Sequence, residues 1–121
     1  MFDPIPTVIG YIRSGRLRAL AVTGTTYLNV LPNVPTVAES VSGYEASTWF
    51  GLVAPKNTPA EIIAKLNSQN NAILADPEKR ARLEDLGGIP MPLTPDEFGK
   101  FIADETDKWA KVIKTANIKP E

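Results

Sequence analysis

The sequence predicts an α/β fold in which helices flank a mostly parallel sheet. Helical and extended patterns alternate along the 121 residues, and this alternation is typical of chains that form parallel sheets. An almost continuous apolar run from Trp49 to Ala54 is typical of a strand with both faces buried. Three helix starts are marked by a capping residue followed by proline. These starts are Thr58-Pro59, Asp76-Pro77 and Thr94-Pro95.

The first third of the chain is expected to contain a helix, a strand and a short helix. Residues 7–14 should be helical because Gly15 follows in the position where helices commonly end. Residues 17–23 are mostly apolar and should form a strand closed by Gly24. A capping box over residues 36–39 should begin a short helix that ends at Ser42-Gly43.

The remainder is mainly helical. Apolar residues at helical spacing follow Thr58 and again follow Thr94, which predicts one apolar face on each helix. A third helix over residues 76–86 should stop at Gly87-Gly88. Residues 89–93 are a weaker strand, since Pro90 and Pro92 restrict them to a sheet edge or an extended segment.

The predicted sheet is short of strands. Typical sheets have about 4–6 strands, and each buried parallel strand needs a neighbour on both sides. The partners of residues 17–23 and 49–54 must come either from another segment of a longer protein or from another copy of this chain. We therefore expect self-association, with strand exchange as one route.

Composition excludes several classes of function. A net charge of −1 with mixed signs gives no basis for binding nucleic acid, and no apolar stretch approaches the ~20 residues of a membrane span. The chain has no cysteine and no histidine, which removes the usual thiolate and imidazole ligands and the commonest general base. No catalytic motif is present, so we expect neither an enzyme nor a cofactor nor a metal site.

The amino terminus has two interpretations. Met1-Phe2-Asp3-Pro4 lacks the basic region and apolar core of a secretory signal, and it resembles a strand end entering a loop. Met1 either begins a small domain or marks a fragment produced by truncation or by an internal start. The fragment interpretation is favoured by a family resemblance.

The resemblance covers essentially the whole chain, and its ordered succession of segments makes it specific. Residues 1–3, 12–23, 31–39 and 43–55 are each similar, in this order, to segments in the C-terminal part of one family of receptors. These are the periplasmic solute receptors of the tripartite tricarboxylate transporters, called Bug or TctC receptors. The resemblance implies a fragment of a two-lobed, type II periplasmic-binding-protein-like fold. On this basis residues 1–43 are a remnant of the second lobe, residues 44–55 a hinge-crossing strand, and residues 56–121 the C-terminal helical part of the first lobe.

The function implied by the resemblance is transport. Such a receptor captures a small mono-, di- or tricarboxylate in the periplasm and presents it to membrane permease subunits. Carboxylates are held largely by backbone N–H groups, hydroxyls and water, so a basic side chain is not obligatory. The alternative is a structural module that associates with itself and binds no solute.

Six residues are candidates for ligand contact. The resemblance places Phe2, Asp3 and Pro4 at a strand end that faces the cleft, although Asp3 before proline is equally explained as a turn residue. Thr23 ends the next strand and borders either the cleft or a simple turn. Trp49 and Phe50 lie in the hinge crossing, where each ring packs either on the ligand or in the core.

Overall fold

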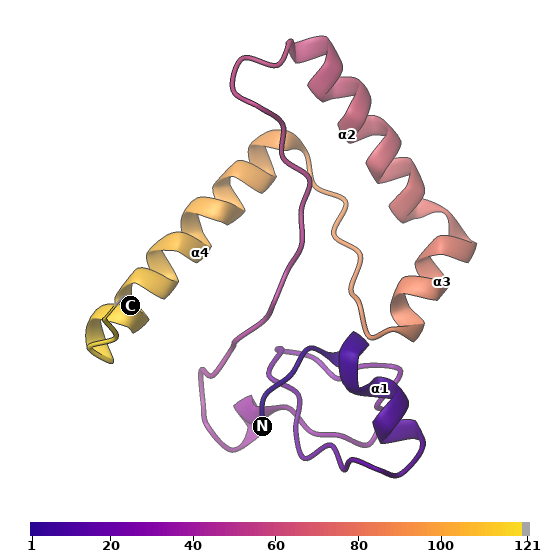
Figure 1. Ribbon diagram of the computed structural model, residues 1–121, viewed down its shortest axis with the longest axis vertical. Helices are drawn as coiled ribbons and strands as arrows, with labels where there is room; N and C mark the ends of the chain where they lie inside the picture. The colour runs from indigo at the N-terminus through magenta and orange to yellow at the C-terminus, as the bar shows by residue number, and fades with distance from the viewer. Residues whose placement is uncertain (120–121) are drawn as a thin grey trace. The chain divides into compact units, whose positions relative to one another are not determined.

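The computed structural model describes residues 1–119, which form four α-helices and one short 3₁₀ helix. The last two residues of the predicted 56–121 part lie outside this range. In chain order the elements are α1 (Ile5–Arg13), η1 (Val37–Glu39), α2 (Ala60–Ala75), α3 (Pro77–Asp85) and α4 (Pro95–Thr115) (Figure 1). The described chain divides into two compact units, one of residues 1–54 and 73–91 and the other of residues 55–72 and 92–119.

Helix α1 begins two residues before its predicted start and ends one residue before its predicted end. Pro4 precedes the helix in an extended conformation, and Pro6 is tolerated because it lies in the first turn, where backbone N–H groups have no helical acceptor. At the other end Gly15 has a φ of +72°, a left-handed conformation that suits glycine. The predicted role of Gly15 as the helix stop is therefore confirmed.

The small core of the first unit surrounds a single parallel bridge. Val22 N donates to the Pro35 carbonyl at 2.8 Å, and Val37 N donates to the Val22 carbonyl at 2.9 Å. Ile9, Val22 and Leu31 are buried against one another, and Thr36 is buried beside the bridge. The strand predicted over residues 17–23 is thus reduced to this one bridge.

The parallel sheet predicted from the sequence does not form within the described residues. Pairing there is limited to two isolated bridges, and residues 49–54 and 89–93 belong to no strand. The expected burial of the first segment was also wrong, because Phe50, Leu52 and Val53 are 90%, 75% and 83% exposed. A strand exists only through ladder hydrogen bonds to a neighbouring segment, and residues 49–54 take part in neither of the two bridges found within residues 1–119.

Two of the predicted helix caps are confirmed, and one is wrong. The Asp76 carboxylate accepts from Lys79 N at 3.0 Å, and Thr94 forms a reciprocal capping box with Glu97. The prediction for Thr58 is wrong because α2 starts at Ala60, so the residue directly before the helix is Pro59. The Thr58 hydroxyl donates backwards to the Pro55 carbonyl at 2.8 Å.

The capping box predicted at residues 36–39 is present, but the helix that it begins is a single 3₁₀ turn. Glu39 Oε1 accepts from Thr36 N at 2.8 Å, and Ser40 ends the turn. Gly43 lies beyond this end with a φ of +78°.

Helices α1 and α3 contact each other within the first unit. Gly87 follows α3 with a φ of +79°, and a Cβ atom built there would overlap the side chain of Ile5. Arg13 Nη2 donates to the Asp85 carbonyl at 3.2 Å at the opposite end of α1. These two contacts fix the start and the end of α1 against the C-terminal end of α3.

In the second unit, two asparagines of α2 fix the segment that leads into α4. The Nδ2 atoms of Asn67 and Asn71 donate to the Leu93 carbonyl at 2.8 and 3.1 Å. Leu93 directly precedes the N-cap Thr94, so this shared acceptor holds the start of α4 against α2.

Candidate functional site

A hollow of about 380 Å³ lies beside α1 in the first unit. It is lined by residues from the chain start, from one side of α1 and from the turn that follows the helix. These residues are Met1, Asp3, Thr7, Val8, Tyr11, Arg16 and Leu17. The lining therefore combines an apolar surface with one anionic, one cationic and two hydroxyl-bearing side chains.

The positive charge of the hollow comes from Arg16, whose position depends on the turn at Gly15. Because Gly15 reverses the chain, the N–H groups of Arg16 and Leu17 both donate to the Tyr11 carbonyl, at 2.9 and 3.1 Å. The Arg16 guanidinium then lies over the Tyr11 ring, 5.6 Å from its centroid. This cation–π contact orients a planar group with several N–H donors, which suits a carboxylate ligand.

The negative charge of the hollow comes from Asp3, whose carboxylate already accepts one hydrogen bond. The Asp3 carboxylate accepts a hydrogen bond from the Thr7 hydroxyl, one turn further along the chain. This bond makes Asp3 a local structural partner at the start of α1. Asp3 retains further acceptor capacity towards an ammonium, a hydroxyl or a water molecule.

Of the six residues predicted to contact a ligand, Asp3 alone lines this hollow among the described residues. Phe2 is 82% exposed, and Pro4 precedes the first residue of α1. The carbonyl of Thr23 accepts from Ala46 N at 3.0 Å. Trp49 and Phe50 follow Ala46 along the chain, and their side chains are 36% and 90% exposed. Ligand contact by these six residues stays a prediction.

Tyr11 and Arg16 were not predicted from the sequence. Arg16 lies beyond the end of α1, so helical periodicity gives no reason to bring it towards Tyr11. The available signal was Gly15, since a left-handed residue after a helix returns the next residues towards the last turn.

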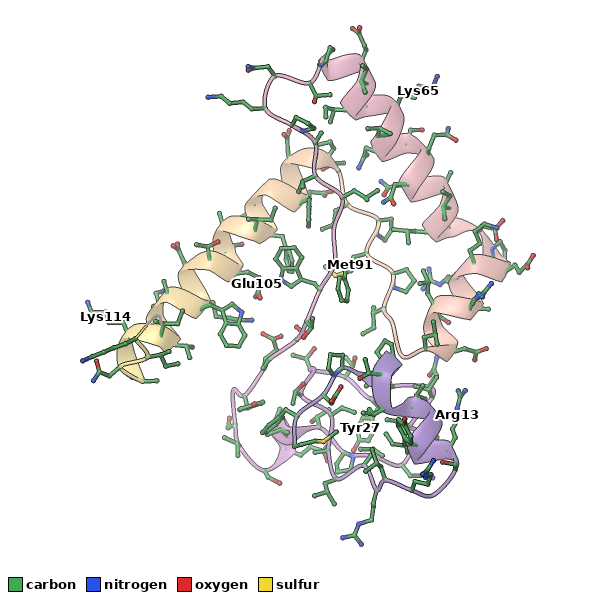
Figure 2. The ribbon with its side chains drawn as sticks, in the orientation of Figure 1. Arg13, Tyr27, Lys65, Met91, Glu105 and Lys114 are labelled. Carbon is green, nitrogen blue, oxygen red and sulfur yellow. The ribbon has the colours of Figure 1, made fainter. Side chains whose placement is uncertain are left out.

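A second hollow of about 210 Å³ lies in the same unit, between the loop at residues 26–30 and the end of α3. Arg80 and Glu84 line it and form an ion pair at 2.8 Å. Tyr27, labelled in Figure 2, also lines it and hydrogen-bonds to Glu39. The charges in this hollow are thus already paired with one another.

The Tyr27–Glu39 contact shifts the pKa of each group in the direction expected when a phenol donates a hydrogen bond to a carboxylate. The backbone N–H of Thr36, followed by the Tyr27 hydroxyl, lowers the pKa of Glu39. The hydrogen bond to Glu39 is the largest cause that raises the pKa of Tyr27. Both groups are solvent-exposed, so the contact organises the loop around η1 without forming a buried charged site.

No cluster of three or more acidic, histidine or cysteine side chains has the arrangement to hold a metal ion within residues 1–119. Over the same range, no helix combines the length and the apolar character needed to cross a bilayer.

Comparison with solved structures defines the class of protein. The chain superposes on the periplasmic binding protein BugD with a TM-score of 0.85 and 32% sequence identity, over 94% of this chain and 39% of BugD. The described backbone therefore has the fold of part of a periplasmic binding protein.

Sequence comparison identifies the family. Residues 1–118 match the model of the tripartite tricarboxylate transporter family receptor, and the chain belongs to this family. It is 39% identical to protein BugT of Bordetella pertussis over 97% of this chain. It is also 35% identical, over 93% of its length, to the UPF0065 protein in the clcB-clcD intergenic region of Pseudomonas knackmussii. The chain spans 36% of BugT and 68% of the Pseudomonas protein.

Proposed function

We propose that this chain contributes to a receptor that captures a small organic acid in the periplasm and delivers it to a membrane permease. The family match across residues 1–118 is the observation that carries this proposal. It is supported by the fold shared with the periplasmic binding protein BugD. Both the family description, a transporter receptor, and the description of BugD, a periplasmic binding protein, refer to solute binding.

We propose that the acid is a mono-, di- or tricarboxylate and that Arg16 contacts it. The guanidinium is held over the Tyr11 ring, so little side-chain freedom remains to be lost when a carboxylate binds. The nearby Asp3 carboxylate repels a second anion, so it favours ligands that carry a hydroxyl or ammonium group next to the carboxylate. This arrangement combines attraction for an acid with selection among acids.

The test is calorimetric titration of the chain with a panel of mono-, di- and tricarboxylates, with and without hydroxyl or amino groups. The Arg16→Gln variant should bind the preferred acid about 10–100-fold more weakly, the value of a charge-assisted hydrogen bond. Arg18→Gln is the matched control, because Arg18 carries the same charge and is also exposed but does not line the hollow. Asp3→Ala should reduce the preference for hydroxy and amino acids.

Two results would contradict the proposal. Equal weakening by Arg16→Gln and Arg18→Gln would show that only net charge matters and would remove the hollow as the site. A flat titration across the whole panel would favour the second candidate, a module that associates with itself and binds no solute. The observation behind that candidate is the exposed apolar segment at residues 50–53.

A further inference from the structure

The two charged side chains of the hollow beside α1 are anchored about one helical turn apart. The Asp3 carboxylate accepts from the Thr7 hydroxyl, and the Arg16 guanidinium lies 5.6 Å from the centroid of the Tyr11 ring. Thr7 and Tyr11 are four positions apart in α1, so their Cβ atoms lie roughly 5–6 Å apart on one face of the helix. No ion pair joins Asp3 to Arg16 within residues 1–119, so both charges are available to a ligand.

The rest of the lining is mainly apolar. Met1, Val8 and Leu17 contribute uncharged side chains, and Val8 shares a face of α1 with Tyr11, three positions later. The volume of about 380 Å³ falls in the range of roughly 300–1,000 Å³ that is usual for small-molecule sites. An apolar group of a ligand gains from burial against this lining. A second charged group placed there would lose water without gaining a partner.

We propose that the acid bound in this hollow is an α-amino acid with an apolar side chain, of about the size of leucine. This inference rests on the proposed function, because it takes Arg16 as the partner of the carboxylate. The α-carboxylate pairs with the Arg16 guanidinium and the α-ammonium with the Asp3 carboxylate, so each charge of the zwitterion meets an opposite charge. The apolar side chain then lies against Val8 and Leu17.

Other acids match this pattern of charges less well. A hydroxy acid offers Asp3 a neutral donor, and hydrogen bonds between charged groups are roughly twice as strong. A dicarboxylate brings a second negative charge either towards Asp3, which repels it, or against the apolar lining, which gives it no partner. The expected order of affinity is therefore the apolar amino acid first, then its hydroxy analogue, then a dicarboxylate.

Calorimetric titration of the chain with four acids of related shape tests the proposal. L-leucine is compared with leucic acid and isocaproate, in which a hydroxyl or a hydrogen replaces the ammonium group. The fourth acid is L-aspartate, in which a carboxylate replaces the branched apolar end. Leucine should bind about tenfold more tightly than isocaproate and about tenfold more tightly than aspartate, with leucic acid between leucine and isocaproate.

Two variants assign these preferences to residues. Asp3→Asn should bring the affinities for leucine and isocaproate close to each other, because the amide keeps the shape of the carboxylate but has no charge for the ammonium. Leu17→Ala should weaken the binding of leucine about fivefold, because it removes apolar surface from the lining. Leu20→Ala is the matched control, since Leu20 is 71% exposed and does not line the hollow, and it should leave the affinity unchanged.

The failure of this inference can be told apart from the failure of the proposed function. Equal affinities for leucine and isocaproate, both reduced by Arg16→Gln, would show that an acid binds without recognition of an ammonium group. Tighter binding of aspartate than of leucine would refute the apolar side chain. Each of these results overturns the inference and leaves the receptor function in place. The absence of binding by every acid, including the di- and tricarboxylates of the wider panel, would overturn both.

Discussion

Replacement of Gly87 by alanine should destabilise the first unit more than any other glycine-to-alanine change tested in it. Two costs combine at this position. Gly87 has a φ of +79°, and the left-handed conformation costs an L-residue about 1–2 kcal/mol. The new Cβ would also lie 3.0 Å from Ile5 Cβ and overlap Ile5 Cγ2, so α1 must shift away from the end of α3.

The steric cost is of the overpacking type, which is typically about 1–3 kcal/mol. The expected loss in the free energy of unfolding is therefore about 2–5 kcal/mol. Ile5 cannot easily rotate away, because a β-branched side chain in a helix has one strongly preferred rotamer. The measurement is urea-induced unfolding followed by far-ultraviolet circular dichroism, at one fixed protein concentration.

Two matched controls separate the two costs. Gly43 has nearly the same φ, +78°, but no atom within 4 Å of its built Cβ, so Gly43→Ala should lose only about 1–2 kcal/mol. Gly10 lies inside α1 with open space around it, and Gly10→Ala should gain about 0.5–1 kcal/mol. In the double variant Ile5→Ala/Gly87→Ala the overlapping methyl is absent. Its loss in the free energy of unfolding should therefore be smaller than the sum of the losses of the two single variants. Equal losses for Gly87→Ala and Gly43→Ala would refute the contact between α1 and α3.

Three further predictions concern the second unit and can be measured by the same urea unfolding. Thr94→Ala should cost about 1 kcal/mol, because it removes the capping box of α4; an unchanged midpoint would contradict this role. The backbone N–H and the hydroxyl of Thr94 lower the pKa of Glu97. Stability from this bond is therefore present above the ordinary glutamate pKa and is lost as the pH falls through the lowered folded-state pKa. Glu97→Gln should flatten this acid dependence, because it removes the titrating carboxylate, whereas Thr94→Ala keeps the backbone N–H that is the larger cause; an unaltered pH profile for Glu97→Gln would assign the dependence to other carboxylates. Finally, Asn67→Ala and Asn71→Ala together should cost more than the sum of the single changes, since either amide alone still satisfies the Leu93 carbonyl; strict additivity would disprove the shared acceptor.

The helix ends show what could be predicted from local sequence. Asp76 and Thr94 cap their helices as expected, and Gly15 ends α1 as expected. These features depend on hydrogen bonds between residues three to five positions apart, so a short stretch of sequence contains both partners. Thr58 is the exception, since α2 starts at Ala60, one residue later than the Thr58-Pro59 pattern predicts, and the Thr58 hydroxyl donates to the carbonyl of Pro55.

The strands and the hollow show what local sequence could not predict. The apolar run at residues 49–54 has strong strand character, yet it forms no strand within the described residues. The apolar pattern cannot show whether a neighbouring segment is available to accept and donate the required hydrogen bonds. The hollow likewise depends on the return of Arg16 towards Tyr11, which follows from backbone geometry at Gly15 and not from helical spacing.

The sequence by itself determined the family, the positions of the α-helices and most of their ends. The family prediction is confirmed by the match over residues 1–118. Only the tertiary structure decided which side chains surround the hollow beside α1, how Gly87 packs on Ile5, and that Phe50, Leu52 and Val53 are exposed. The physical reason is the range of the interactions: helices and caps are stabilised by neighbours in sequence, whereas strands and cavities require partners that are distant along the chain or belong to another molecule.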